Sequence, residues 1–348
     1  MSKSGKPKNI KNIVVIDLAF IGDVILATPV LRALKEAWPR AEITMLTVPL
    51  TAEVAAMNPY VDAVLTYDKR GEQKGFSGMF KAAKVLRKRK FDLAVCMNFA
   101  VRGAVVAWLA RIPNRLGYDA QHAGLFLTTA ASSQRIRLQH EALNHLEVLK
   151  PWGLGTADTS LALRPSPEVL QSLADKRQAL SLADADYIVF CPFGNNSRRE
   201  MALETIRETA AALAKQQVVY LIGGPKEAEK LQAAVQGLAA VRVRVLAGDL
   251  TLPELAAFVQ RADCMVTVDS GPLHIAQAVQ CPTVALFGPA LPEIWGPRGA
   301  QDIVLYKKRS CSPCDNTGNC QGKPCIQDIT AEEIRMAVQQ VLAANQKI

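Results

Sequence analysis

The sequence lacks any long apolar run. No hydrophobic stretch approaches the roughly 20 residues of a membrane-spanning helix, so no such helix is expected. Residues 1–9 are basic and polar, and the apolar stretch after them is interrupted by Asp17 and Asp23. This is not the pattern of a secretory signal peptide. We therefore expect the protein to stay in the cytoplasm.

Aromatic residues are also few, at 6% of the chain, and no zinc-finger, RRM or helix-turn-helix pattern is visible. The formal net charge is nevertheless +9, with an isoelectric point near 9.2. Such a balance favours anionic partners, which include nucleic acid, phosphorylated sugars and acidic membrane surfaces. Without a nucleic-acid-binding motif, nucleic acid is the weakest of the three, and we expect no such partner.

The eight cysteines fall into two groups. Four lie singly among apolar residues and are predicted to be buried small hydrophobes: Cys96, Cys191, Cys264 and Cys281. The other four lie within fifteen residues: Cys311, Cys314, Cys320 and Cys325. Their spacing could build a structural metal site, but we prefer free thiols. A catalytic metal is not expected, because no carboxylate or histidine pairs with the group.

The 348 residues suffice for about two domains, and 49% of them are hydrophobic. Apolar strands and helical patterns alternate in both halves, which predicts an α/β fold with parallel, doubly wound sheets. We divide the chain into domains at 1–165 and 186–328, a linker at 166–185, and a terminal helix at 329–348. The expected strands are 12–18, 43–48, 61–67, 91–97, 187–191, 218–222, 241–246, 265–268 and 282–287.

The terminal helix has a clear start signal. Thr330 and Glu333 form a capping-box pattern, and Ile329 with Ile334 fits a hydrophobic staple. An apolar stripe then follows at helical spacing: Ile334, Val338, Val341 and Leu342. We expect this helix to pack across the domain junction.

The most informative stretch is 264–289. An apolar strand ends at Asp269, Ser270 is a good helix N-cap, and Gly271-Pro-Leu-His274 begins a helix. Ligands bind beyond the carboxyl ends of such strands, and a helix start there can hold phosphate. Asp269 could then accept from a sugar hydroxyl, and His274 could reach an anion. An ordinary strand–turn–helix unit is the alternative interpretation.

Residues 69–90 are strongly basic. A solvated helix face accounts for most of these side chains. The other interpretation is a docking surface for anionic lipid headgroups.

Several blocks of the sequence resemble glycosyltransferase family 9, the ADP-heptose:lipopolysaccharide heptosyltransferases, with the second-heptose type most similar. These blocks follow the family's order: Ile21-Gly-Asp-Val-Ile-Leu-Ala-Thr-Pro, Arg115-Leu-Gly-Tyr118, Leu221-Ile-Gly-Gly-Pro-Lys-Glu227, Asp269-Ser-Gly-Pro-Leu-His-Ile-Ala276 and Leu286-Phe-Gly-Pro289. The resemblance implies a GT-B fold, in which two Rossmann-like domains face each other across a cleft. The first would bind the acceptor and the second the nucleotide sugar.

The implied activity is an inverting, metal-independent transfer of L-glycero-D-manno-heptose from ADP-heptose to the lipopolysaccharide inner core. Such a displacement needs a general base for the acceptor proton and positive charge or N–H dipoles at the departing diphosphate. The family's base falls on Asp23, which could equally serve as a helix cap.

The resemblance also assigns the other site residues. Arg199 takes the place of the family's diphosphate lysine, and Glu227 and Leu250 fall at the nucleoside. The remaining donor-binding positions are Gly194, Asn195, Asp269, Ser270, Gly271 and His274. On the acceptor side we place Gly22, Arg102 and Arg115.

The implied partners are the nucleotide-sugar donor, an anionic lipid A–Kdo–heptose acceptor and the membrane surface. The protein would act as a peripheral protein on the cytoplasmic face of the inner membrane, without a cofactor. Two alternatives remain: a transferase of the same fold that uses another nucleotide-activated sugar, and a non-catalytic binder of phosphorylated ligands.

Overall fold

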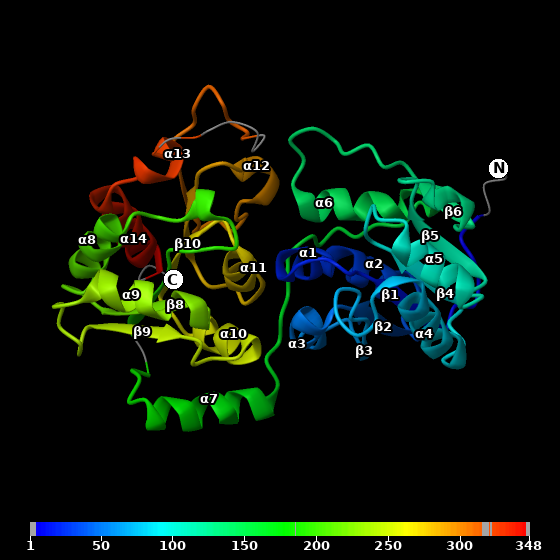
Figure 1. The fold of residues 1–348 in the computed structure, drawn as a ribbon, viewed down its shortest axis with the longest axis horizontal. Helices are drawn as coiled ribbons and strands as arrows, with labels where there is room; N and C mark the ends of the chain where they lie inside the picture. The colour runs from blue at the N-terminus through cyan, green and yellow to red at the C-terminus, as the bar shows by residue number, and fades with distance from the viewer. Residues whose placement is uncertain (1–4, 185, 315–319, 321, 346–348) are drawn as a thin grey trace. The chain divides into compact units, whose positions relative to one another are not determined.

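The structure, a computed structural model, describes residues 5–184, 186–314, 320 and 322–345. The chain forms two compact units, Met1–Arg164 and Pro165–Ile348 (Figure 1). Each unit is built on one six-stranded sheet with helices on both faces. Within the described residues, no helix combines the length and the apolar character that crossing a membrane requires.

The sheet of the first unit is parallel throughout, in the order β3-β2-β1-β4-β5-β6. This is the doubly wound order of dinucleotide-binding folds, with two strand sets growing outward from a central pair. Its strands are β1 Asn12–Ile16, β2 Glu42–Thr47, β3 Ala63–Thr66, β4 Leu93–Cys96, β5 Asn114–Tyr118 and β6 Thr129–Ala131.

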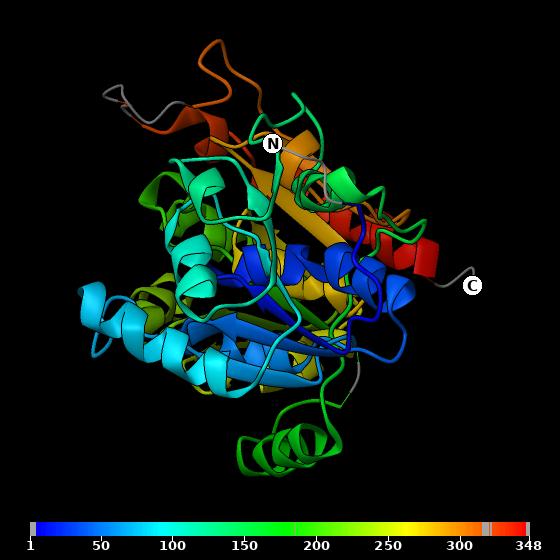
Figure 2. The same ribbon diagram turned by 90° about the vertical axis from the view of Figure 1, so that its right-hand side faces the viewer.

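Helices cover both faces of this sheet. One face packs against α2 and η3, with Val30, Leu34 and Leu149 in its core. The other packs against α4 and α5, with Leu86 and Val106 in its core. In Figure 2, α4 is the light-blue helix at the lower left of the picture. Its helices are α1 Ile21–Leu26, α2 Thr28–Ala37, η1 Pro49–Thr51, α3 Ala52–Ala56, α4 Gly75–Lys88, α5 Arg102–Leu109, η2 Ala123–Leu125, α6 Glu141–Leu146 and η3 Glu147–Trp152.

The sheet of the second unit repeats this arrangement. Its order, β12-β11-β10-β7-β8-β9, is the same doubly wound order, again with parallel strands. The strands are β7 Tyr187–Cys191, β8 Val218–Gly223, β9 Val243–Ala247, β10 Cys264–Val268, β11 Thr283–Phe287 and β12 Ile303–Tyr306. The predicted α/β class with doubly wound parallel sheets is therefore confirmed.

Helices α8, α9 and α14 fill one face of the second sheet through residues such as Ile206, Leu231 and Val338. On the opposite side, Phe258 of α10 stacks on Tyr187 at 4.7 Å between ring centroids. Helix α7 packs against α10. The helices are α7 Pro167–Ala179, η4 Ser197–Arg199, α8 Leu203–Leu213, η5 Pro225–Glu227, α9 Ala228–Val235, α10 Leu252–Gln260, α11 Gly271–Ala278, α12 Pro292–Trp295, α13 Pro324–Gln327 and α14 Ala331–Asn345.

The terminal helix α14 begins with the predicted capping box. Thr330 donates its backbone N–H to Glu333 Oε2 at 3.0 Å, and Glu333 N donates to Thr330 Oγ1 at 3.2 Å. Ile334, Val338 and Val341 are buried in the core of the second unit. The apolar stripe is thus used within this unit, and the expected packing across the domain junction stays a prediction.

The sequence between the first two strands predicts one helix at 24–38, with Pro39 just past its end, and this prediction is wrong in its bounds. The structure has two helices there, α1 and α2, which meet at Ala27. Pro29 has no N–H to continue the hydrogen-bond ladder, and the Thr28 hydroxyl donates to Ile25 O at 2.7 Å instead. Helix α1 begins at Ile21, so Gly22 lies in its first turn.

Candidate active site

Each sheet has one point where the strand order reverses, between β1 and β4 in the first sheet and between β7 and β10 in the second. In doubly wound sheets, ligands bind beyond the carboxyl ends of the strands at this switch point. Asp17 and Asn98 follow β1 and β4, whereas Gly194 and Asp269 follow β7 and β10. The switch point of the second unit therefore holds two predicted site residues, Gly194 and Asp269. The switch point of the first unit holds two polar residues that were not predicted, Asp17 and Asn98.

Asp23, the predicted base, lies in the first turn of α1 and is half-buried. Its Oδ2 accepts a hydrogen bond from the N–H of Phe20 at 3.1 Å. This is the capping role weighed in the sequence analysis, although the N-cap itself is Phe20. The same carboxyl group lines a small hollow of about 80 Å³. Asp23 can therefore cap α1 and still face an open space.

The same hollow is built from a polar cluster that the sequence analysis did not assemble. It is lined by Asp23, Met97, Asn98, Phe99, Tyr118, Arg135, Glu141, Asn144 and His145. Glu141 is 1% exposed and accepts from Arg135 Nη2 at 2.7 Å. His145 Nε2 lies 3.4 Å from Glu141 Oε1. The cluster thus brings two carboxylates, an arginine and a histidine to one cavity.

Asp17, directly after β1, lies close enough to Asp23 and His145 for their charges to interact. Its carboxyl group is fully buried, and its Oδ1 accepts from Asn98 Nδ2 at 2.9 Å and from Ala19 N at 3.1 Å. Within the part of the chain that the structure describes, its Oδ2 has no hydrogen-bond partner, and neither has His145 Nδ1. Two buried polar atoms are therefore left unbonded close to Asp23.

The charges of this cluster shift its pKa values. Burial raises the pKa of Asp17, and the neighbouring charge of Asp23 adds to this effect. Burial lowers the pKa of His145, but the hydrogen bond with Glu141 and the charges of Asp17 and Asp23 outweigh it, so the net direction is upward. His145 is thereby favoured in its cationic form among carboxylates.

A larger hollow of about 460 Å³ opens beside the Ala19–Phe20 turn. Lys69 and Arg70 supply its cationic side chains, and Asn98 belongs to its wall. Lys69 Nζ donates to Leu18 O at 2.5 Å. Burial lowers the pKa of Lys69, as do the nearby charges of Arg70 and Arg102. The lining also includes Asp68, so two cations and one carboxylate face this hollow, which is a candidate site for an anionic ligand.

The predicted acceptor-side residues lie in different surroundings. Arg102 begins α5 and donates to Tyr67 OH at 3.0 Å. Its charge contributes to the lowered pKa of Lys69. Arg115 instead lies near the amino end of β5, where its Nε donates to Phe126 O at 2.6 Å. The guanidinium of Arg115 therefore holds a loop, and we leave it out of the proposed site.

In the second unit, one arginine joins the two loops at the switch point. Arg199 Nη1 donates to the backbone oxygen of Asp269 at 2.9 Å and lies 3.0 Å from its Oδ2. Gly194 belongs to the same contact, since a Cβ there would lie 3.2 Å from Ser270 Cβ. The structure thus brings Gly194, Arg199, Asp269 and Ser270 together.

The turn 269–271 is more buried than the sequence suggests. Asp269 and His274 are 3% and 4% exposed. Burial raises the pKa of Asp269, against the opposing charge of Arg199. Ser270 is the N-cap of α11, as predicted, but its hydroxyl donates to Val268 O at 3.2 Å rather than capping the helix. Asp269 therefore contacts Arg199. At the start of α11, Pro272 has no N–H and Leu273 N donates to Ser270 O at 3.1 Å, so the amide of Gly271 is the one that a ligand can meet.

The three remaining donor-side residues follow neighbouring strands. Asn195 is exposed in the loop after β7. Glu227 follows β8 and accepts from Gly224 N at 2.6 Å. Leu250 follows β9 and is half-buried. All three lie at the carboxyl edge of the sheet, the edge at which ligands bind.

The cysteines separate as predicted into buried and surface groups. Cys96, Cys191, Cys264 and Cys281 are buried, whereas the four near the C-terminus are exposed or half-buried, and all eight thiols are free. Among the residues that the structure describes, no group of three or more His, Cys, Asp or Glu side chains could hold a metal ion. Cys314 Sγ accepts from Arg198 Nη1 at 3.4 Å.

The cluster around Asp23 had weak signals in the sequence. Asp17 interrupts an otherwise apolar strand, and Glu141 and His145 are four residues apart on one helix, a spacing that places them on one face. Neither signal says that α6 comes to the end of β1, because that contact joins segments over 120 residues apart.

Comparison with known proteins agrees with the fold. The sequence profile described as glycosyltransferase family 9 (heptosyltransferase) matches residues 79–324. Lipopolysaccharide heptosyltransferase 3 of Escherichia coli is 27% identical over 297 residues, which cover 80% of this chain and 84% of that protein. Lipopolysaccharide heptosyltransferase 2 of Salmonella typhimurium is 25% identical over 319 residues, with 84% and 87% covered.

Solved structures give the same result. A family 9 glycosyl transferase from Veillonella parvula superposes with a TM-score of 0.87 at 26% identity, covering 98% of this chain and 100% of that one. The ADP-heptose lipopolysaccharide heptosyltransferase II of E. coli superposes with a TM-score of 0.81 at 21% identity, covering 96% and 99%. The family profile spans well over half of the sequence, and the resemblance seen in its motifs is confirmed. The chain belongs to glycosyltransferase family 9, the heptosyltransferases, and is a glycosyltransferase.

Proposed function

We propose that this protein transfers L-glycero-D-manno-heptose from ADP-heptose to the inner core of lipopolysaccharide, with inversion and without a metal ion. The observation that carries the proposal is the pair of switch-point sites. One has a half-buried carboxylate, Asp23, on a polar hollow. The other has a cationic side chain, Arg199, beside the start of a helix. The names of the relatives support the choice of sugar and acceptor.

The chemistry assigns one role to each site. Asp23 takes the proton of the acceptor hydroxyl as that oxygen attacks the anomeric carbon. The bond between the anomeric carbon and the diphosphate oxygen breaks at the same time, and ADP leaves. Arg199 and the amide of Gly271 at the start of α11 stabilise the charge that develops on the diphosphate. Asp269 holds Arg199 in position.

The remaining donor residues bind the rest of ADP-heptose. Gly194 and Asn195 lie in the loop nearest to Arg199, His274 lies in the first turns of α11, and Glu227 and Leu250 follow the outer strands where the nucleoside is expected. On the acceptor side, Arg102 with Lys69 and Arg70 suits an acceptor that carries carboxylates and phosphates. Gly22 allows that acceptor to approach the backbone of α1.

The acceptor is lipid-linked, so we place the protein at the cytoplasmic face of the inner membrane as a peripheral protein. Soluble core acceptors that carry different numbers of heptoses would identify the position that is glycosylated.

Two substitutions of Asp23 test the base. Asp23→Asn keeps an oxygen that can accept from the N–H of Phe20, whereas Asp23→Ala removes both the cap and the carboxylate. We expect both variants to lose transfer by a factor of about 10² or more, to bind ADP normally, and to differ from each other only in stability. Turnover near the wild-type rate in Asp23→Asn would remove Asp23 from the chemical step.

The same assay decides between this proposal and its alternatives. Mass measurement of the acceptor after incubation with ADP-heptose shows the added heptose directly. If only another nucleotide sugar gives a mass increment, the fold transfers a different sugar. If no donor gives one although ADP binds, the chain is a binding protein, a result at odds with its family.

A further inference from the structure

Helices α4 and α5 lie side by side on one face of the first sheet, and their outer side chains are unusual. Phe76, Phe80 and Trp108 are 77%, 59% and 48% exposed, although each is large and aromatic. The inner side of the same helices is well buried through residues such as Leu86 and Val106. The exposed surface of these aromatic side chains therefore adds nothing to the core, although the Trp108 ring also lies 5.5 Å from that of Phe126.

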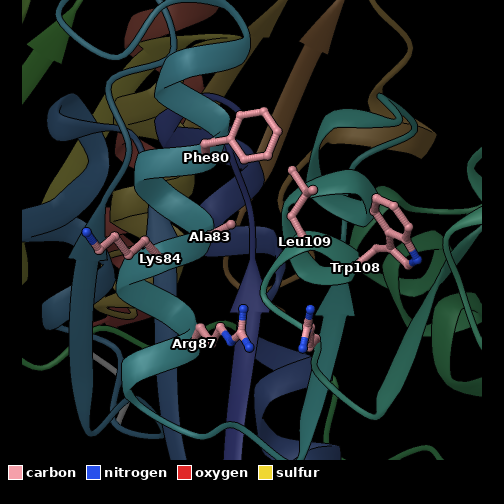
Figure 3. A pocket seen from close by; sticks show the side chains of 7 residues that line it. Phe80, Ala83, Lys84, Arg87, Trp108 and Leu109 are labelled. Carbon is pink, nitrogen blue, oxygen red and sulfur yellow. The ribbon is translucent and has the colours of Figure 1, made fainter.

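A hollow of about 600 Å³ separates the two helices on the outside. Figure 3 shows Phe80, Lys84 and Arg87 of α4 on one side, and Trp108 and Leu109 of α5 on the other. Arg111, just after α5, also lines the hollow. Aromatic rings therefore line one part of the hollow and cations the other. We call Phe76, Phe80, Lys84, Arg87, Trp108 and Arg111 the α4–α5 surface.

The charge of this surface has one sign. The sequence has no Asp or Glu from Gln73 to Phe91, or from Leu93 to Tyr118. Seven basic residues of the first segment are exposed: Lys74, Lys81, Lys84, Arg87, Lys88, Arg89 and Lys90. Within the described part of the chain, Lys84, Arg87 and Arg111 form no ion pair. Their charge is available to an external anion.

Exposed aromatic rings beside unpaired cations fit one kind of partner best. Aromatic side chains bind at the headgroup level of a bilayer, where one part of the ring is apolar and its edge is solvated. Lysines and arginines close to an anionic leaflet are attracted to its phosphates. Nucleic acid offers the phosphates as well, but not an extended apolar layer that would cover Phe76 and Phe80 together.

We propose that the α4–α5 surface binds the headgroup layer of an anionic phospholipid bilayer. Phe76, Phe80 and Trp108 enter the layer, and Lys84, Arg87 and Arg111 contact its phosphates. The choice of a membrane as partner rests on the proposed function, which requires a lipid-linked acceptor. Membrane attachment is thus assigned to α4 and α5. The residues of this surface are different from those of the polar cluster around Asp23.

The test is co-sedimentation of the full chain with vesicles of phosphatidylglycerol and phosphatidylcholine, and with vesicles of phosphatidylcholine alone. We expect binding to the anionic vesicles only, weakened by salt because the contacts are screened. The triple variants Phe76→Ser/Phe80→Ser/Trp108→Ser and Lys84→Glu/Arg87→Glu/Arg111→Glu should each lose tenfold or more in vesicle affinity.

Matched controls carry equivalent changes elsewhere. Arg40→Glu/Lys215→Glu/Arg242→Glu changes the net charge equally at exposed positions, and Val241→Ser/Met336→Ser removes exposed apolar side chains from the second unit. Both should bind vesicles like the wild type. If the charge-reversal control loses as much affinity as the α4–α5 variant, or if both triple variants still bind, the proposal is overturned.

Two further outcomes are decisive. Tighter binding to a DNA or RNA oligonucleotide than to anionic vesicles, lost in the same variants, would overturn a membrane role in favour of nucleic acid. Transfer to a water-soluble core acceptor without lipid should be unchanged in both α4–α5 variants. If the wild type fails in that assay yet binds vesicles, the proposed function is wrong while the docking surface stands.

Discussion

Arg199 and Asp269 bind the loops after β7 and β10 to each other, through a hydrogen bond of 2.9 Å to the backbone oxygen and an ion pair of 3.0 Å to Oδ2 of Asp269. Because Asp269 is almost fully buried, this pair holds the guanidinium at the switch point of the second sheet. A cation is thereby positioned before any ligand arrives, which lowers the cost of ordering it on binding.

This relationship predicts the effect of changes at Arg199. Arg199→Ala should weaken ADP binding by about tenfold to a hundredfold, the range expected for lost charge-assisted hydrogen bonds. Arg199→Lys should recover only part, because one ammonium group cannot replace a guanidinium that has several donors. Calorimetric titration with ADP measures both. Arg198→Ala is the matched control, and an equal loss in that variant would show that only the general charge matters.

His145 predicts a pH-dependent contribution to stability. Its folded-state pKa is raised above the ordinary value of 6.5. Its contribution is therefore fully present below that value and is lost as the pH rises through the folded-state pKa. His145→Asn should lower the free energy of unfolding by about 1 kcal/mol or more at pH 6, and by less at pH 9.

Urea unfolding at the two pH values measures this difference. The exposed His122→Asn variant serves as the control, since Asn tolerates the left-handed backbone found there, with φ of 62°. A deficit in His145→Asn that is the same at both pH values would mean that packing, rather than charge, explains the role of His145.

Asp17 has the same pH dependence as His145, but its replacement is expected to raise stability rather than to lower it. Its pKa is raised by burial, so the folded state holds the proton more tightly than the unfolded state. Wild-type stability should then decrease as the pH rises from the ordinary value of 3.8 through the folded-state pKa. Asp17→Asn can keep the bonds from Asn98 and Ala19, and should exceed the wild type in stability by about 1–3 kcal/mol at neutral pH. Thermal unfolding at pH 4 and pH 7.5 checks this, and a variant that is less stable at pH 7.5 would contradict it.

Glu254 attaches α7 to α10 and predicts a loss of stability at neutral pH. Its Oε2 accepts from Lys176 Nζ at 2.7 Å and from Thr251 N at 2.8 Å. Burial works to raise the pKa of Glu254, but these bonds outweigh it and lower the pKa to about 2. The contribution is present above about 4.5 and is lost as the pH falls toward about 2.

Glu254→Gln should therefore cost about 2 kcal/mol at pH 7, and the difference from the wild type should shrink in acid. Glu208→Gln on the exposed side of α8 is the control. Denaturant titrations at pH 7 and pH 3 give both values, and an equal cost at both pH values would mean that the carboxylate charge is not what holds α7.

The sequence predicts most of the strand and helix order, because short apolar runs end at glycine, proline or capping residues. It does not predict β6, whose three residues Thr129–Ala131 have little apolar character, or β12, which is an incompletely buried edge strand. The pattern also does not predict α9. These elements exist because a neighbouring strand or sheet face is already in place to receive them.

The candidate site divides in a similar way. Arg199, Asp269 and Gly194 are predicted by local motifs, since each lies directly after a strand. The Asp17–Glu141–His145 cluster is not, because its members come together only when α6 packs beside α1 and α2. Local patterns identify the loops at a switch point but not the side chains that reach them from a distant helix.

Both sheets share one strand order, and each forms its core with its own helices. The chain thus has two units with separate cores. Loops of one unit can change in sequence without altering the core of the other. Under the proposed division of labour, evolution can alter the turns after β7, β8 and β9 to admit a new sugar nucleotide while the recipient glycan stays the same. Diversification by the replacement of single loops follows directly from this repeated strand order.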